Sequence, residues 1–236
     1  MCDRVELMPP RKDPSVTGEI YHIINRGVAS MPIFVNGRHY NRFLEAMLYY
    51  QHAAPPLRYS YFSRLPQSAK VEKLSQLKQT KNYLVEIICY CLMPNHFHLL
   101  LKQVSDNGIS EFIRKFSESY AHYFNTKNKR IGPLFQGRFK SVRVETEEQL
   151  LHVSRYIHLN PYSAGIVKSI TELKKYPHSS LPEYLGSAEN NLCQKDLVLS
   201  YFKGNSGYED FVSGQADYQR ELARIKNLLL EEPEAG

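Results

Sequence analysis

The stretch from Ile88 to Gln103 constrains the fold more than any other part of the chain, because two apolar runs flank a Met-Pro-Asn break. This pattern predicts a buried β-hairpin with strands near 84–92 and 96–103. Successive side chains of a strand point to opposite faces, so His96 and His98 share one face of the expected sheet. Two imidazoles on one face can bind one metal ion, although the same spacing also suits an ordinary half-buried polar face.

The remaining periodic segments complete the order strand, helix, strand, strand, helix, strand. This order predicts an α+β fold of the ferredoxin-like or RRM-like type, in which helices cover an antiparallel sheet. We also expect the final helix of the core to follow the last strand directly and to end at a proline. The expected segments are strands at 19–26 and 140–146 and helices at 38–51, 109–125 and 147–160, with Pro161 as the stop.

The chain is expected to form an N-terminal arm over 1–17, a main domain over 18–185 and a helical extension over 186–236. Residues 54–83 interrupt the main domain with an Ala-Ala-Pro-Pro start and a lysine-rich run. We expect an inserted arm with a short polar helix there, more readily a solvated excursion than a DNA contact. The extension carries an amphipathic stripe that is expected to pack on the main domain rather than to dimerise. The stripe consists of Leu222, Ile225 and Leu229.

Positive charge is concentrated in one part of the sequence. Eight basic residues and one acidic residue lie between Arg114 and Arg143, whereas the whole chain carries a net charge of only +6. Aromatic residues are interleaved with these bases, which suits a phosphate backbone with bases available for stacking. The alternative is a solvated basic face with the aromatics in the core. The candidate DNA-binding residues are Asn25, Arg26, Arg114, Lys115, Lys129, Arg130, Arg138, Lys140 and Arg143.

The sequence contains neither a signal-peptide pattern nor an apolar run of about twenty residues, the length needed to span a membrane. We therefore expect a cytoplasmic protein without a membrane partner. Its four cysteines, at 2, 89, 91 and 193, form no C-x-x-C pair and are expected to be reduced.

The segment from Arg155 to Pro161 offers a second constellation. If it ends a helix, Tyr156 and Asn160 lie four residues apart on one face, with a phenol and a carboxamide side by side. The chemistry of the sequence alone does not distinguish Tyr156 from Tyr120 or Tyr123 as a nucleophile.

Three motifs, taken together, carry a family resemblance. Met93 to Leu100 (MPNHFHLL), Gly132 to Ser141 (GPLFQGRFKS) and Tyr156 to Pro161 (YIHLNP) follow one another in the chain. In this order they resemble the single-tyrosine HUH transposases, and more narrowly the branch of REP-associated tyrosine transposases. The resemblance extends from about residue 18 to residue 184.

The resemblance implies an enzyme that nicks and joins single-stranded DNA next to a hairpin such as a REP-like palindrome. Tyr156 would be the nucleophile and would form a 5′-phosphotyrosine link, while His96, His98 and Asn160 would bind Mg²⁺ or Mn²⁺. His158 would be structural or contact DNA. Relatives often have tryptophan where this chain has Phe135 and His178, which leaves the aromatic packing at His178 open. The resemblance fits a monomer or a homodimer.

Two other classes of function remain open at this point. A domesticated, sequence-specific DNA-binding regulator could keep the motifs without transposing. An RNA-binding module of the same fold is the weaker alternative, because its stacking aromatics would belong where the two histidines lie.

Overall fold

The computed structural model describes residues 15–188 and 192–221. Its centre is a four-stranded sheet with the order β2-β3-β1-β4, in which every neighbouring pair is antiparallel. The element order reproduces the predicted α+β, ferredoxin-like arrangement, with α5 following the last strand. The strands are β1 (Ile20–Arg26), β2 (Val85–Met93), β3 (His96–Gln103) and β4 (Lys140–Val144).

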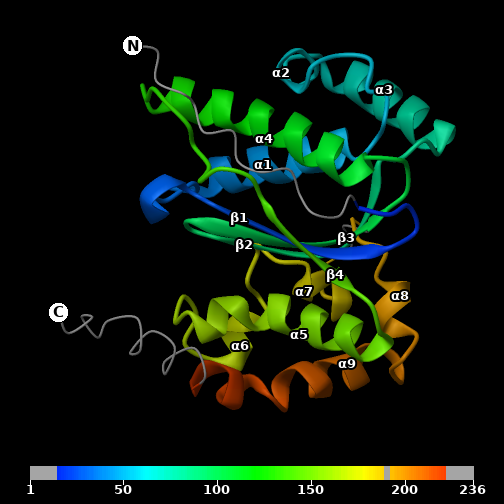
Figure 1. Ribbon diagram of the computed structural model, residues 1–236, viewed down its shortest axis with the longest axis vertical. Coiled ribbons are helices and arrows are strands. Elements are labelled where there is room, and N and C mark those ends of the chain that lie inside the picture. Colours follow the sequence, from blue (N-terminus) through cyan, green and yellow to red (C-terminus); the bar gives the residue numbers. More distant parts are fainter. Residues whose placement is uncertain (1–14, 189–191, 222–236) are drawn as a thin grey trace, which may run out of the picture.

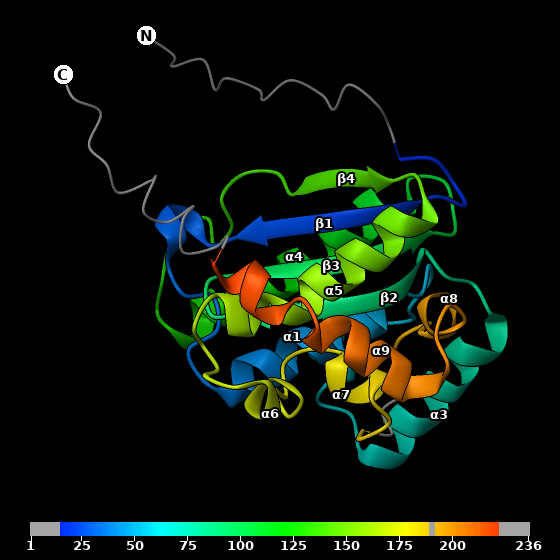
Figure 2. The same cartoon turned by 90° about the horizontal axis from the view of Figure 1, so that it is seen from below.

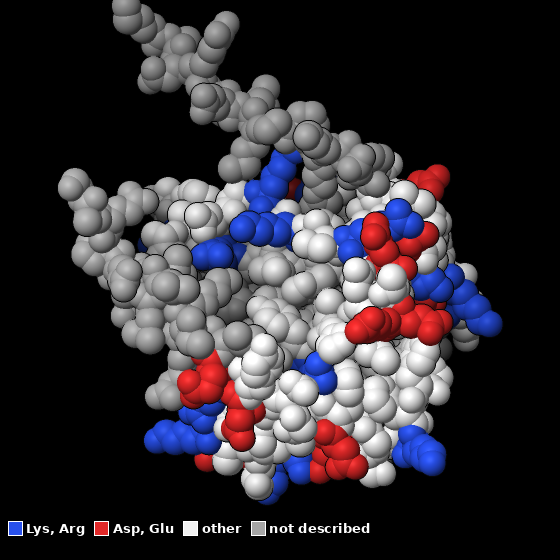
Figure 3. All heavy atoms as spheres, turned by 60° about the horizontal axis from the view of Figure 1, so that its bottom comes forward, with Lys and Arg blue, Asp and Glu red and all other residues white. Residues whose placement is uncertain are grey.

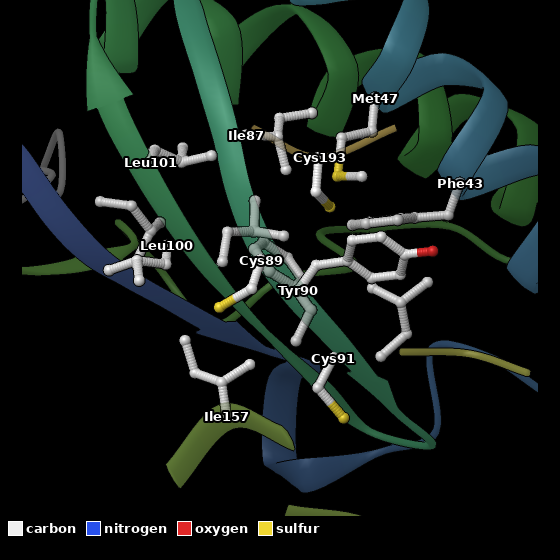
Figure 4. Packing of buried hydrophobic residues seen from close by; sticks show 14 of the residues in the cluster. Phe43, Met47, Ile87, Cys89, Tyr90, Cys91, Leu100, Leu101, Ile157 and Cys193 are labelled. Carbon is white, nitrogen blue, oxygen red and sulfur yellow. The ribbon is translucent and has the colours of Figure 1, made fainter. Parts of the chain in front are cut away.

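The two faces of the sheet are covered by different helices (Figure 1). Helices α1 (Gly37–Tyr50) and α4 (Gly108–Lys127) pack on one face, where Phe43 contacts Phe97 of β3 and Phe116 of α4. Helix α5 (Glu147–Ser163) lies on the other face, and α9 (Gly204–Ser213) lies outside it (Figure 2). In Figure 4, Ile157 of α5 points toward the sheet near Leu100. The side chains of His96, His98 and Leu100 alternate with those that face α1 and α4, so they share the α5 face.

The central hairpin forms as predicted. β2 and β3 pair from Val85↔Gln103 to Met93↔His96, which leaves Pro94 and Asn95 as the turn. Proline has no backbone donor, and here its carbonyl accepts hydrogen bonds from the backbone N–H groups of Ile33 and Phe34. The turn is thereby tied to the segment that follows β1.

Helix α5 begins where the sequence indicates and ends later. Thr146 caps it by accepting a hydrogen bond from the backbone N–H of Gln149. The expected stop at Pro161 is wrong, because the helix continues through Pro161 to Ser163. A proline removes the hydrogen bond to the carbonyl four residues earlier, and its ring crowds that carbonyl. The last turn of α5 can accommodate this distortion because little of the helix follows it. The Pro161 carbonyl then accepts from the N–H groups of Ile166 and Val167, which closes the helix end.

The insertion contains more helix than expected. It forms α2 (Tyr59–Phe62) and the fourteen-residue α3 (Gln67–Thr80), not a single short helix. It is anchored by aromatic packing, since Tyr59 and Phe62 lie against Tyr49 of α1. The lysine and glutamine content of the insertion does not indicate this aromatic packing.

The C-terminal part packs on α5 through short helices, which are α6 (Ile170–Leu173), α7 (Leu181–Tyr184), α8 (Asp196–Leu199) and α9. The predicted stripe of Leu222, Ile225 and Leu229 lies outside the described residues. No helix in the described ranges is long and apolar enough to cross a membrane.

Candidate active site

The two histidines of β3 face α5 and lie beside Tyr156. His98 pairs with Ile24 of β1 and Cys91 of β2, which places it near the centre of the sheet. The ring centroids of His96 and His98 are 5.0 Å apart, and those of His98 and Tyr156 are 5.6 Å apart in an edge-to-face arrangement. The fold therefore brings a phenol from one element to an imidazole pair from another.

Both imidazoles are neutral at physiological pH. Burial and the nearby charge of Arg26 lower the pKa of His96 to about 4. Burial, followed by the neighbouring His96 and His22, holds the pKa of His98 well below its usual value. A neutral imidazole carries the lone pair that a metal ion requires.

The tautomer of His96 follows from its hydrogen bond. Its Nδ1 lies 2.7 Å from the Oδ1 atom of Asn95, and a carbonyl oxygen only accepts. The proton is therefore on Nδ1, and Nε2 carries the lone pair. This is the arrangement seen when a metal-binding histidine is oriented by a second hydrogen-bond partner.

Tyr156 and Asn160 occupy the same side of α5. The Tyr156 side chain is 43% exposed, yet its ring packs against the histidines, and burial raises the pKa of its phenol while Asn160 partly offsets the shift. The Nδ2 group of Asn160 donates a hydrogen bond to the backbone carbonyl of Tyr156 at 2.8 Å, so the carboxamide oxygen is the atom suited to a cation. In the described ranges, no three His, Cys, Asp or Glu side chains are placed to bind a metal ion. A site here would thus need an additional oxygen ligand such as Asn160.

A third histidine, His22 of β1, joins this cluster and was not among the predicted site residues. Its Nε2 lies 3.0 Å from Nδ1 of His98, and its ring meets Tyr156 edge-to-face with the centroids 6.0 Å apart. The alternation of the first strand puts His22 on one face with Ile24. The sequence alone does not reveal which residues of β3 pair with this strand.

His158 is structural, and the alternative of a DNA contact is wrong, because the residue is fully buried. Its Nδ1 lies 2.7 Å from the Tyr208 hydroxyl, and its Nε2 lies 2.7 Å from the Ser180 hydroxyl. The Tyr208 hydroxyl in turn contacts Ser154, while Ser180 accepts from the backbone N–H of Tyr90 in β2. This chain of hydrogen bonds connects α5 to the sheet on one side and to α9 on the other.

The candidate DNA-binding residues separate into groups. Arg26 and Lys140 are exposed on strands at positions that share the α5 face with the histidines. Asn25 points the opposite way and lines a cleft of about 640 Å³ together with Arg114, Arg138 and the aromatic residues Phe135 and Phe139. Basic and aromatic groups thus meet in one hollow on the α4 side of the sheet.

The other candidates have partners within the protein or lie elsewhere. Lys115 contacts Glu111 and the carbonyl of Ala53, and Arg143 pairs with Glu19 at 3.0 Å. The Arg130 side chain donates to carbonyls of its own loop, which fixes the connection between α4 and β4. Those carbonyls belong to Gly132, Pro133 and the Asn125 side chain. Lys129 is exposed in the same loop.

Figure 3 shows several lysine and arginine side chains in one band of the surface, while acidic and basic side chains are mixed over other parts of this face. The positive charge of the sequence is therefore partly clustered in space and partly neutralised by neighbouring carboxylates.

The aromatic packing at His178 is retained without tryptophan. The His178 ring stacks on Tyr40 of α1 with the centroids 3.6 Å apart and the planes 7° apart, and Tyr176 meets it edge-to-face. The imidazole supplies the flat surface that this position requires.

Comparison with known proteins agrees with this geometry. Residues 53–160 match the family model described as "Transposase IS200 like", a stretch that contains both histidines, Tyr156 and Asn160. No curated protein matches the chain by sequence. The fold is similar to that of a solved structure, "Structure of the REP associates tyrosine transposase bound to a REP hairpin", with a TM-score of 0.50 and 16% identity over 80% of this chain and 90% of that one. Residues 53–160 of this protein, a little under half of the chain, therefore resemble the IS200-like transposases, a family of DNA-processing enzymes that generally use divalent metal ions.

Proposed function

We propose that this protein cleaves and rejoins single-stranded DNA next to a hairpin, with Tyr156 as the nucleophile. The observation that carries the proposal is the contact of the Tyr156 ring with His98 on a face that also presents His96. Among the tyrosines that the chemistry of the sequence left in competition, Tyr120 is fully buried and donates to the carbonyl of Ile33, which argues against a role in attack.

The donor set fits a divalent cation such as Mg²⁺ or Mn²⁺. Nε2 of His96 and His98 and the carboxamide oxygen of Asn160 would hold the ion, and other positions would remain for water and phosphate. When bound, the ion would supply Lewis-acid polarisation of the scissile phosphate. Nitrogen and oxygen ligands from two elements, without a thiolate, suit an exchangeable ion better than structural zinc.

The proposed reaction of Tyr156 needs no nucleotide cofactor. The phenolic oxygen attacks phosphorus, its proton passes to solvent, and a phosphotyrosine bond forms as the bond from phosphorus to the 3′ oxygen breaks. The leaving oxygen takes a proton and becomes a free 3′-hydroxyl. Because the link is a phosphodiester, attack by another 3′-hydroxyl reverses the step and joins strands. The raised pKa of Tyr156 means that the phenol alone is a weak nucleophile near neutral pH, so it needs a polarised phosphate.

Two surfaces would bind the DNA. Arg26 and Lys140 flank the histidines on the α5 face, where they would contact phosphates next to the scissile bond. The cleft with Arg114, Arg138 and Phe135 would bind a second part of the same DNA by charge and stacking. The fold neighbour is bound to a REP hairpin, which supports a DNA hairpin as the ligand of this chain.

The test is to incubate the protein with hairpin-flanked single-stranded DNA and Mn²⁺ and to measure protein-linked DNA. The wild type should form a covalent adduct, and Tyr156→Phe should form none. Tyr201→Phe is the matched control, because Tyr201 has a nearly equal exposed fraction of 44% and lies outside the site. Equal adduct yields from wild type and Tyr156→Phe would reject the assignment, and binding without any adduct would favour the regulator.

A further inference from the structure

The proposed metal site uses Nε2 of His98, so it requires the proton of this imidazole to be on Nδ1. Its Nδ1 lies 3.0 Å from Nε2 of His22, and one of these two atoms must carry the proton between them. If His22 donates, the proton of His98 resides on Nε2, and that atom has no lone pair for a cation. If His98 donates from Nδ1, its Nε2 is free to bind.

We infer that His22 is a positioning residue that accepts the Nδ1–H of His98 and so presents the Nε2 lone pair of His98 to the divalent ion. This inference rests on the proposed function and assigns His22 a role in it. His22 would do for His98 what Asn95 does for His96, where the accepting atom is a carbonyl oxygen. A metal-binding histidine commonly donates its other ring N–H to such a partner, which fixes its tautomer and its ring orientation.

The surroundings of His22 suit this role. The residue is 8% exposed, and its strand neighbours are Leu100 of β3 and Val142 of β4. Its ring lies stacked near that of His98, with an interplanar angle of 22°, and its other contact is the edge of Tyr156. A ring held in this way has little freedom to turn away from His98.

Direct metal binding by His22 is the competing arrangement, and the geometry disfavours it. The Nε2 atom that would coordinate the ion is the atom already at hydrogen-bond distance from His98. A neutral imidazole has one nitrogen that accepts, and in His22 the nitrogen placed to accept from His98 is Nε2.

The test uses two substitutions of similar size with opposite capacity to accept. His22→Phe fills the space without an acceptor, whereas the side-chain oxygen of His22→Gln can still accept. The first readout is nitrogen NMR of histidine-labelled, metal-free protein, which reports the protonated nitrogen of His98. We expect the proton on Nδ1 in the wild type, a shift toward Nε2 in His22→Phe, and at least partial recovery in His22→Gln.

The second readout is Mn²⁺ affinity by titration calorimetry. His22→Phe should weaken binding by about 10-fold to 100-fold, the usual effect of losing such a partner. His39→Phe is the control, since His39 is also a buried histidine, 4% exposed, but lies on α1 against Tyr123 and Phe124. It should leave the affinity unchanged.

A wild-type tautomer and wild-type Mn²⁺ affinity in His22→Phe would overturn the inference. The inference would also be overturned if His22→Phe lost Mn²⁺ binding as completely as His98→Ala and His22→Gln did not restore it. That result would make His22 a metal ligand. Failure of the proposed metal site is a separate outcome: if the wild type and His96→Ala bind Mn²⁺ equally, the site is wrong, while the tautomer of His98 still tests the hydrogen bond.

Discussion

At the scale of single residues, the site depends on which nitrogen of each imidazole carries a proton. Asn95 settles this for His96, because its Oδ1 atom at 2.7 Å can only accept. Its Nδ2 group also donates to the carbonyl of Ser30 at 3.2 Å, and a flipped carboxamide would lose this bond, so the hydrogen bonds favour Oδ1 toward His96. A residue of the hairpin turn thus determines which nitrogen of His96, the first residue of β3, is available to the proposed metal ion.

The first prediction concerns this turn residue. Asn95→Leu removes the acceptor and should weaken Mn²⁺ binding by about 10-fold, whereas Asn95→Asp keeps an acceptor and should hold the affinity near that of the wild type or above it. Titration calorimetry of both variants measures the difference. Equal losses in the two variants would show that the turn geometry, not the acceptor, matters.

The sequence predicted that the side chains of His96 and His98 lie on the same face of the sheet, because alternation along a strand is a local property. It did not indicate His22, whose role depends on the register between β1 and β3, and register is set by the assembled sheet. The opposite directions of the Asn25 and Arg26 side chains likewise follow from strand alternation.

At the scale of elements, α5 carries Tyr156 and is held by the hydrogen bonds of His158. One direction of donation connects the side chains: Ser180 donates to Nε2, Nδ1–H donates to Tyr208, Tyr208 donates to Ser154, and Ser154 donates to the carbonyl of Leu151. In this direction the Tyr90 carbonyl, 3.2 Å from the Ser180 hydroxyl, keeps its hydrogen bond from the Ser180 backbone N–H. The C-terminal helix α9 therefore helps to fix the helix that carries Tyr156, the proposed nucleophile.

The second prediction is that Tyr208→Phe destabilises the fold by about 1–3 kcal/mol, because it leaves the buried Nδ1–H of His158 without a partner. Urea unfolding measures the change. Tyr61→Phe is the control, since Tyr61 is 61% exposed on the insertion and should have little effect. A cost for Tyr208→Phe no larger than that of the control would refute the role of the network.

The third prediction concerns pH. Burial lowers the pKa of His158 to about 3, while in the unfolded chain it is near 6.5, so between these values only the unfolded state binds the proton. The contribution of His158 to the free energy of unfolding is fully present above about pH 6.5. It falls as the pH decreases, by about 1.4 kcal/mol per pH unit.

Unfolding by urea at pH 7.5, 6.0 and 5.0, with a chelator present, measures this dependence. His22 and His96, with pKa values lowered to about 4, add to the slope. His158→Gln should give a shallower slope than the wild type. A wild-type stability that is constant or rises toward pH 5 would contradict the account.

In the whole molecule, the two proposed DNA-binding surfaces lie on opposite sides of the sheet. The histidines and Tyr156 face α5, whereas the cleft with Arg114 and Arg138 opens on the α4 side. We propose that a DNA that uses both passes around the edge of the sheet formed by β4, because Arg138 of the cleft and Lys140 of the α5 face are two residues apart at the start of this strand. Lys140, the first residue of that strand, lies in its path.

The fourth prediction follows from this path. Arg138→Ala and Lys140→Ala should each weaken binding to hairpin-flanked DNA and reduce the slope of log affinity against log salt by about 1. Lys78→Ala, on α3 of the insertion, is the control and should change neither quantity. Fluorescence anisotropy at several salt concentrations measures both. An effect of Lys78→Ala equal to the others would mean that the insertion binds DNA.

The overall arrangement could be predicted from the sequence because strand alternation, helical periodicity and the proline turn are local signals. Three features could not be predicted in this way. They are the packing of α2 on Tyr49, the continuation of α5 through Pro161 and the hydrogen bonds of Arg130 to carbonyl groups near it in the chain. Each depends on partners that are distant in sequence or on irregular backbone, where no periodic pattern exists.

In the proposed reaction, the Tyr156 oxygen becomes covalently joined to DNA. The most direct measurement is mass spectrometry of peptides from protein trapped after reaction with a hairpin-flanked single strand and Mn²⁺. We expect a nucleotide-modified peptide that contains Tyr156, and we expect none when Mn²⁺ is replaced by a chelator. A modified peptide that carries the DNA on a different tyrosine would contradict it.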